Sequence, residues 1–235
     1  RGLGDVYKRQ INVSADVLRI KDFTWNVNAN VSYNKNEITE LYNGITEYVA
    51  SDTGRMVAVG HPLGEFYLNR YAGVNPTNGD ALWYTKDGEI TTEYNESDKV
   101  MLGKTHEAPW QGGFGTTLSW QGFSLSAQFT WVADRWMLNN DRVFQESNGL
   151  FSAYNQSKRM LYDRWKKPGD VTDIPRYGVT PQLDSRFLED ASFLRLKNLM
   201  LSYTFPQKWL QRTNFLSSAR IYAQGQNLLT FTSFT

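Results

Sequence analysis

Residues 112–136 read GGFGTTLSWQGFSLSAQFTWVADRW, and apolar and polar side chains alternate along most of this stretch. The alternation breaks at Gln121-Gly122, where glycine favours a tight turn, and then resumes. A period of two places one set of side chains on each face of a β-strand. The stretch therefore predicts two antiparallel strands, residues 112–120 and 123–136, that form a hairpin.

Two further segments, residues 24–33 and 199–205, alternate in the same way. In all four segments the polar set consists mainly of Asn, Ser, Thr and Gln, with few charges. Such a pattern is typical of a barrel wall that has lipid on one face and a water-filled lumen on the other. A β-sandwich core would give the same alternation, but its solvent face normally carries more Lys and Glu. The uncharged polar set favours an antiparallel transmembrane β-barrel, and transport over catalysis.

The composition is nearly neutral and rich in aromatic residues. The 235 residues carry a net charge of +1, which gives no electrostatic case for a nucleic-acid partner. The absence of Cys excludes disulfides, thiol catalysis and Cys-based zinc sites. Mean hydropathy is −0.52, and no apolar run approaches the roughly 18 residues of a spanning helix.

Aromatic residues make up 14% of the chain, and this abundance has two interpretations. It fits aromatic girdles at the two interfaces of a membrane barrel. It also fits a soluble all-β carbohydrate-binding module, which is the alternative function. An enzyme such as a β-rich glycosidase needs two positioned carboxylates, and the sequence singles out no such pair.

The first ten residues, RGLGDVYKRQ, are charged and lack the apolar core of a secretory signal. They resemble the read-through sequence found at the ends of translated metagenomic contigs. We therefore expect residues 1–10 to be a non-native leader and residues 11–235 to be the C-terminal part of a longer barrel.

The rest of the chain divides into strands and long loops. Strands are expected at residues 11–20, 23–34, 63–74, 192–205 and 218–231, and a small hairpin at 81–84 and 89–92. Residues 35–62 and 138–190 are irregular and long enough to be functional loops, with a helical turn or two at 157–165.

Turn length assigns these segments to two rims. In bacterial outer-membrane barrels, turns on the periplasmic rim are short and loops on the extracellular rim are long. The turns at Lys21-Asp22 and Gln121-Gly122 are then periplasmic, and the two long loops face outward. The strand at residues 23–34 then runs outward and the strand at 112–120 runs inward. An even number of full crossings, zero or two, must lie between these two strands, so the chain has about six to eight spanning strands.

Three stretches in the second half resemble the SusC/RagA-like family of TonB-dependent outer-membrane transporters. They are FLEDASFLRLKN at residues 187–198, LSYTFP at 201–206 and IYAQGQNLLTFT at 221–232. Two shorter pairs of runs are also similar to that family. They are DRW at 163–165 with DIPR at 173–176, and AGVNP at 72–76 with LWY at 82–84.

The resemblance implies the C-terminal third or so of a plugged barrel of about 22 strands. It implies uptake of oligosaccharides or peptides across the outer membrane of a Gram-negative, Bacteroidetes-like bacterium. The implied partners are a SusD-like surface lipoprotein above the outer loops, outer-membrane lipid, and the TonB complex acting through the missing plug. Because the plug and the earlier strands are absent, we expect that this polypeptide does not transport alone.

Aromatic residues of the second long loop are the candidate ligand-binding residues, because aromatic faces stack on sugar rings and anchor protein interfaces. Packing of the loop onto itself is an equally good explanation. The candidates are Trp136, Trp165, Tyr162 and Tyr154, with the two tryptophans preferred.

No catalytic, metal or cofactor site is expected. Glu189, Asp190, Arg195 and Lys197 cluster near one strand start. We interpret them as an ion-pair network at the barrel rim or lining the lumen against the plug. The two histidines, His61 and His106, lack the spacing of zinc ligands.

Overall fold

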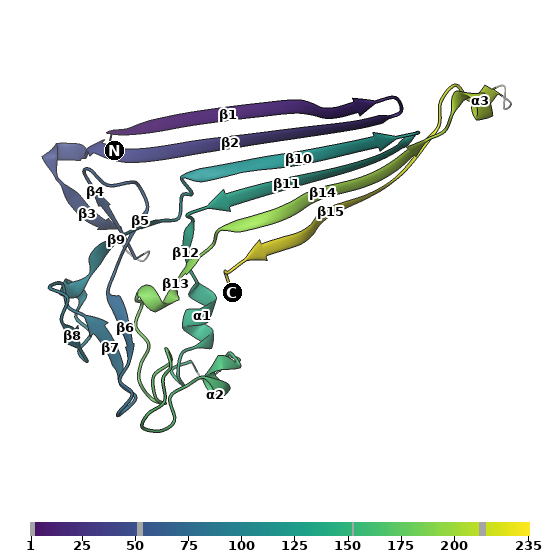
Figure 1. Ribbon diagram of the computed structural model, residues 1–235. Helices are drawn as coiled ribbons and strands as arrows, with labels where there is room; N and C mark the ends of the chain where they lie inside the picture. Colours follow the sequence, from purple (N-terminus) through teal and green to yellow (C-terminus); the bar gives the residue numbers. More distant parts are fainter. Residues whose placement is uncertain (1–2, 51–53, 152, 212–214) are drawn as a thin grey trace.

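The largest unit is one antiparallel sheet of six strands in the order β1-β2-β10-β11-β14-β15 (Figure 1). The computed structural model describes residues 3–50, 54–151, 153–211 and 215–235. The six strands are β1 (Leu3–Ile20), β2 (Phe23–Glu40), β10 (Trp110–Trp120), β11 (Phe123–Ala133), β14 (Phe193–Thr204) and β15 (Arg220–Thr232). Each strand pairs with the next along the chain once two long insertions are set aside, so the sheet is an up-and-down meander.

The topology confirms the four alternating segments as strands and decides the number of crossings. β2 pairs directly with β10, from Phe23 opposite Trp120 to Tyr33 opposite Trp110. Zero full crossings therefore separate them, and the described residues form six long strands.

The first hairpin is longer than the sequence indicates. We expected strands at residues 11–20 and 23–34, but the ladder continues, through one register shift, to Leu3 opposite Glu40. The expectation of an irregular segment at residues 35–62 is wrong at this point, because the partner strand extends as far and satisfies its backbone groups. Residues 1–2 lie outside the described residues, and the non-native origin of residues 1–10 stays a prediction.

The two faces of the sheet differ in chemistry and in cover. Trp25, Leu118, Leu125 and Leu201 lie in one row across four neighbouring strands, and all four are exposed or half-buried. A sandwich would bury this row under a second sheet. The described part of the chain places no second sheet on this row, so the apolar face is uncovered and suited to contact with lipid. This is the arrangement of a partial barrel wall.

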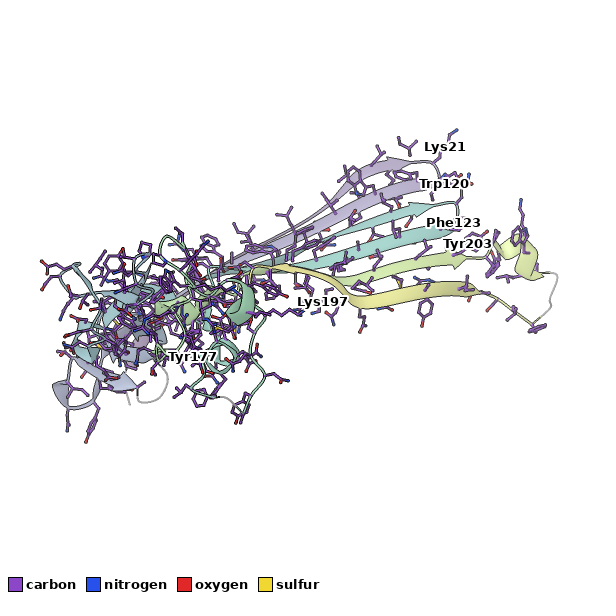
Figure 2. The ribbon with its side chains drawn as sticks, turned by 90° about the horizontal axis from the view of Figure 1, so that it is seen from below. Lys21, Trp120, Phe123, Tyr177, Lys197 and Tyr203 are labelled. Atoms are coloured by element: carbon purple, nitrogen blue, oxygen red, sulfur yellow. The ribbon has the colours of Figure 1, made fainter. Side chains whose placement is uncertain are left out.

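Aromatic residues mark both ends of the apolar face. Near the turns, the rings of Phe123 and Tyr203 have centroids 4.5 Å apart (Figure 2). At the other end, the rings of Tyr33 and Trp110 are also 4.5 Å apart. Trp110 and Trp120 are about ten residues apart on one strand, which at a tilt of ~45° spans ~24 Å. This height agrees with the apolar band of outer-membrane barrels, about 25 Å.

The polar face carries amides and hydroxyls, and a glycine lets two amides converge. Asn28, Gly115, Gln128 and Asn198 form one row across β2, β10, β11 and β14. A Cβ at Gly115 would lie 2.7 Å from the Gln128 Nε2 and 3.0 Å from the Asn28 amide. The close approach of these two side chains therefore explains the glycine at this position of the strand.

Two insertions form a second unit, the outer body, at the end of the sheet opposite the two-residue turns (Figure 1). The first runs from residue 41 to 109 and the second from 134 to 192. The first contains η1 (Tyr42–Gly44), β3 (Glu47–Ala50), β4 (Arg55–Ala58), β5 (Glu65–Leu68), β6 (Arg70–Val74), β7 (Ala81–Tyr84), β8 (Ile90–Thr91), η2 (Glu96–Asp98) and β9 (Val100–Thr105). The second contains β12 (Trp136–Leu138), α1 (Asn140–Gln145), α2 (Arg159–Tyr162), η3 (Ser185–Phe187) and β13 (Leu188–Asp190).

The outer body holds most of the buried apolar core. Phe66 and Leu68 of β5 pack against Leu188 of β13, so both insertions contribute. Partly buried Leu102, Trp136, Leu138 and Leu183 surround them. None of the described helices, including α3 (Gln207–Leu210) between β14 and β15, is long and apolar enough to cross a membrane.

On the apolar face, the Trp25 Nε1 donates a hydrogen bond of 2.9 Å to the Thr116 hydroxyl. In hydrocarbon both groups would otherwise lack a partner. We expect a double-mutant cycle of Trp25→Phe and Thr116→Val in the complete barrel to give a coupling energy of roughly 0.5–1.5 kcal/mol. Denaturant unfolding in vesicles measures it.

Thr117→Val is the matched control, because Thr117 lies next to Thr116 but on the polar face, where its hydroxyl bonds Ser126. Its cycle with Trp25→Phe should show no coupling. Equal coupling in both cycles would contradict a specific bond across the lipid face.

Candidate functional site

A buried aspartate joins the two insertions at the centre of the outer body. The Asp184 carboxylate accepts hydrogen bonds from the Trp83 Nε1 at 2.8 Å and from the Arg186 backbone N–H at 2.9 Å. Asn69 forms a β-bridge with Asp184, and both residues are fully buried. Burial raises the pKa of Asp184, and the bonds from Trp83 and Arg186 oppose this without cancelling it. The outer body is thus one packed unit and not two independent loops.

A second tie lies farther from the sheet. The Arg176 Nε donates to the Asp80 Oδ1 at 2.9 Å, and the Trp165 Nε1 donates to the Pro76 carbonyl at 3.2 Å. The Trp165 ring covers Gly79, where any Cβ would collide with it. Gly79 also has a φ of +79°, which favours glycine. The turn at residues 75–80 is therefore shaped to receive the tryptophan of the other insertion.

A network of ion pairs fixes α1 and α2 to β13. The Glu146 carboxylate is fully buried and accepts from the Arg142 Nε at 3.0 Å and from the Arg159 Nη1 at 2.7 Å. Arg142 also pairs with Glu189 on β13, and Arg159 forms two bonds of 2.7 Å with Asp173. Two arginines are therefore shared among three carboxylates, one of which is removed from water.

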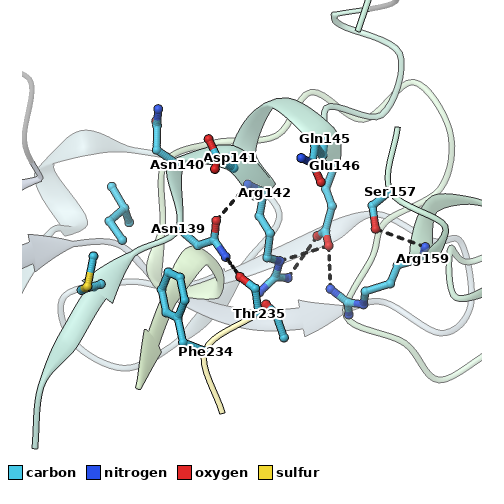
Figure 3. A pocket seen from close by; sticks show the side chains of 12 residues that line it. Asn139, Asn140, Asp141, Arg142, Gln145, Glu146, Ser157, Arg159, Phe234 and Thr235 are labelled. Carbon is cyan, nitrogen blue, oxygen red and sulfur yellow. Dashed lines mark hydrogen bonds and ion pairs between the residues drawn. The ribbon is translucent and has the colours of Figure 1, made fainter. Parts of the chain in front are cut away.

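This network forms one wall of a cavity of about 510 Å³ (Figure 3). Leu138 and Asn139 line another side, and Phe234 and Thr235 complete it. The Thr235 backbone N–H donates to the Glu189 Oε2 at 3.0 Å, and the Asn139 Nδ2 donates to the Thr235 carbonyl at 2.7 Å. The segment after β15 is therefore tied into the base of the outer body.

The network controls the ionisation of Glu189. Partial burial opposes the charged form, but hydrogen bonds from Arg142, from the Thr235 backbone and hydroxyl and from Asn139 outweigh it. The net effect lowers the pKa of Glu189 below the ordinary carboxyl value. The expected ion pairs among Glu189, Asp190, Arg195 and Lys197 do not form among the described residues. Glu189 pairs instead with Arg142, and Arg195 donates to the Thr230 hydroxyl. A carboxylate held ionised between donors serves as an ion-pair partner and not as a proton donor.

The two preferred aromatic candidates are engaged in packing. Trp136 packs against the core of the outer body, with the Lys104 Nζ 3.4 Å from its ring centroid. Trp165 covers Gly79 and bonds Pro76. Their role as ligand contacts stays a prediction, and the structure gives each an established contact within the protein.

The two tyrosine candidates remain available to a ligand or partner. Tyr162 is 70% exposed and Tyr154 is 62% exposed. Tyr154 belongs to a surface cluster with Phe144 and Phe151, whose ring centroids lie 6.2 and 6.4 Å from its own. The structure does not bring the four candidates into one site. Among the described residues, no three His, Asp or Glu side chains gather as a metal site.

Sequence reasoning missed Arg142, Glu146 and Asp184. A spacing of four between Arg142 and Glu146 was a visible signal for a helical ion pair. Asp184 gave no signal, because its partner Trp83 lies 101 residues earlier in the chain.

No family model matches the sequence, but individual proteins do. TonB-dependent receptor P3 of Formosa agariphila is 27% identical over an alignment of 248 positions, which covers 96% of this chain and 24% of the relative. TonB-dependent receptor SusC of Bacteroides thetaiotaomicron is 25% identical over an alignment of 245 positions, which covers 94% of this chain and 22% of the relative.

Solved structures of the RagAB peptide importer match more closely in sequence. The 'open-open' state gives a TM-score of 0.91 at 36% identity, covering 99% of this chain and 26% of that one. The 'closed-closed' state gives a TM-score of 0.91 at 35% identity, with the same coverage. The SusC/RagA-like resemblance is confirmed. The chain spans about a quarter of the length of these SusC/RagA-like relatives.

Replacing Glu146 by Gln should loosen α1 and α2, because a neutral buried amide cannot form ion pairs with the Arg142 and Arg159 guanidinium groups. We expect a local loss of roughly 1–3 kcal/mol, measured as faster limited proteolysis of the second insertion in the complete barrel. Asp163→Asn is the control, since the exposed Asp163 contacts the same Arg159 at 3.6 Å and should matter little. Equal proteolysis of the two variants would contradict the assignment.

Acid should weaken the same region through Glu189. Because the folded state lowers the pKa of Glu189, its contribution is present above the ordinary carboxyl pKa and disappears as pH falls through the folded value. Asp184 acts in the opposite direction: because the folded state raises its pKa, protonation of Asp184 in acid favours the folded state. Proteolysis measured from neutral pH to pH ~3 should accelerate in acid, and Glu189→Gln should remove part of that acceleration. An unchanged pH profile in this variant would count against the assignment.

Proposed function

We propose that this chain forms part of the wall of an outer-membrane, TonB-dependent importer of oligosaccharides or peptides. The sheet supports this proposal most directly, since its exposed apolar face ends in aromatic rims ~24 Å apart, close to the height of an outer-membrane apolar band. The bacterium would be Gram-negative and Bacteroidetes-like, as the organisms of the sequence relatives suggest.

The polar face supports transport of neutral, hydrogen-bonding solutes. Amides and hydroxyls dominate it, and some of them bond one another, such as Thr117 with Ser126 and Ser119 with Ser124. Such a wall offers donors and acceptors without a strong electric field, which suits sugars and peptide groups. The RagAB structures are those of a peptide importer, which favours peptides among the two classes.

The proposed partners act at opposite ends of the sheet. A SusD-like surface lipoprotein would cover the outer body, where Tyr154 and Tyr162 are exposed. The TonB complex would act through a plug contributed by sequence outside this chain. The relatives are receptors and transporters, and the carboxylates Glu146 and Glu189 are held by arginines, so a catalytic role has no support.

Disruption of the gene for the complete receptor should abolish growth on oligomeric peptides or glycans as sole source. Growth on the corresponding monomers should be unchanged, because they pass through porins. Complementation with the complete receptor should restore growth only in a strain with a functional TonB complex. Growth that is independent of TonB would overturn the proposal.

Among the loop aromatics, we expect substitution of the tyrosines to affect binding alone and substitution of the tryptophans to affect both binding and packing. Tyr162→Ala should weaken binding of substrate or lipoprotein while the outer body keeps its resistance to protease, because the exposed ring packs on little. Trp165→Ala should weaken both, since it uncovers Gly79. Affinity measured on the purified complete receptor tests this, and unchanged affinity in Tyr162→Ala would remove Tyr162 as a contact.

A further inference from the structure

The connection between β14 and β15 differs from the other two at its rim. The turns Lys21-Asp22 and Gln121-Gly122 have two residues each, whereas β14 ends at Thr204 and β15 begins at Arg220. This longer connection contains α3, which lies beyond the end of the sheet in Figure 1.

All three connections belong to one rim. The Gln121 backbone N–H donates to the Asp22 carbonyl at 3.3 Å, and the Thr204 N–H donates to the Gly122 carbonyl at 2.8 Å. The longer connection is closed at its base by the Phe205 N–H, which donates to the Ala219 carbonyl at 3.0 Å. α3 therefore projects from a defined point on the rim that carries the short turns.

An aromatic series leads from the apolar face of the sheet onto α3. Ring centroids are 4.5 Å apart for Phe123 and Tyr203, 5.2 Å for Tyr203 and Phe205, and 6.4 Å for Phe205 and Trp209. Phe123 and Tyr203 are paired across β11 and β14 on the apolar face. Trp209 thus continues the lipid-facing surface past the last residue of the strand.

The side chains of α3 are divided between support and exposure. Leu210 is buried, while Trp209 is 59% exposed and Lys208 is also exposed. A tryptophan with one apolar body and one N–H, beside a lysine with an apolar stem, is the pair of side chains favoured at a membrane–water interface. A tryptophan exposed to water alone has no such favourable contact for its apolar ring.

We propose that α3 is a membrane anchor whose Trp209 ring lies in the headgroup region of the leaflet on the short-turn rim. The occupant is lipid, because the aromatic series is continuous with the apolar face and because the short turns beside α3 carry no aromatic residue of their own. The inference rests on the proposed outer-membrane function. It adds a residue-level contact that would fix the depth and tilt of the β14–β15 hairpin.

Spin labels in the complete receptor, reconstituted in phospholipid vesicles, test the proposal. This chain has no Cys, so Trp209→Cys, Lys21→Cys and Leu125→Cys each give one label site within it. Collision with oxygen and with a water-soluble nickel complex reports the depth of each label. The label at 209 should lie roughly 5–10 Å below the water boundary, whereas the label at Lys21, in a polar turn of the same rim, should be in water.

The label at Leu125 tests the barrel separately from the anchor. Leu125 lies on the apolar face between Leu118 and Leu201, one lipid-facing position in from the aromatic rim at Phe123. If 125 is in hydrocarbon and 209 is as accessible to nickel as 21, the anchor is overturned and the barrel stands. If 125 is itself in water, the barrel and the proposed function fail together. Should Trp209→Cys not assemble, Lys208→Cys places the label on the same turn of α3. A label at 208 that is as accessible to nickel as the label at 21 would likewise overturn the anchor.

Discussion

The pairing of backbone N–H and C=O groups along continuous ladders is the constraint on which the rest of this structure depends. In a membrane, a strand whose backbone groups lack partners costs several kcal/mol for each group. The six strands meet that requirement between β2 and β14, where each strand is paired on both sides. Because pairing fixes the register, it also aligns lipid-facing residues with lipid-facing residues from strand to strand, and this alignment creates the apolar face.

The outer body obeys a different rule, because it lies in water. It has no lipid to satisfy an apolar surface, so it buries a core of its own around Leu68 and Leu188. It can also bury ions when they are neutralised, as Glu146 is by Arg142 and Arg159. The chain therefore contains a sheet with an exposed apolar face and an outer body with a buried apolar core, and the two parts meet at the strand ends.

The sheet was predictable from sequence because its signal is local. The alternation around Trp120 and Phe123, and the turn between them, need no knowledge of distant residues. The outer body was not predictable, because its contacts join residues such as Trp83 and Asp184 that are 101 positions apart. Trp136 and Trp165 show how predictions from sequence miss such long-range contacts. Their aromatic character suggested ligand contact, and only the structure shows the protein surfaces that they cover. The motif at residues 187–198 carried family information, yet the partner of its Glu189 came from α1.

The way the two insertions are threaded has a consequence for the order of folding. Each insertion is closed at its base by strand pairing, the first by β2 with β10 and the second by β11 with β14. Closing a contact such as Trp83 with Asp184 directly would have to overcome the entropy of a chain segment of about 100 residues. Once the hairpin of β10 and β11 has paired on both sides, the insertions are held side by side and that entropy has largely been lost. From this connectivity we expect the wall to assemble first and the outer body to fold last.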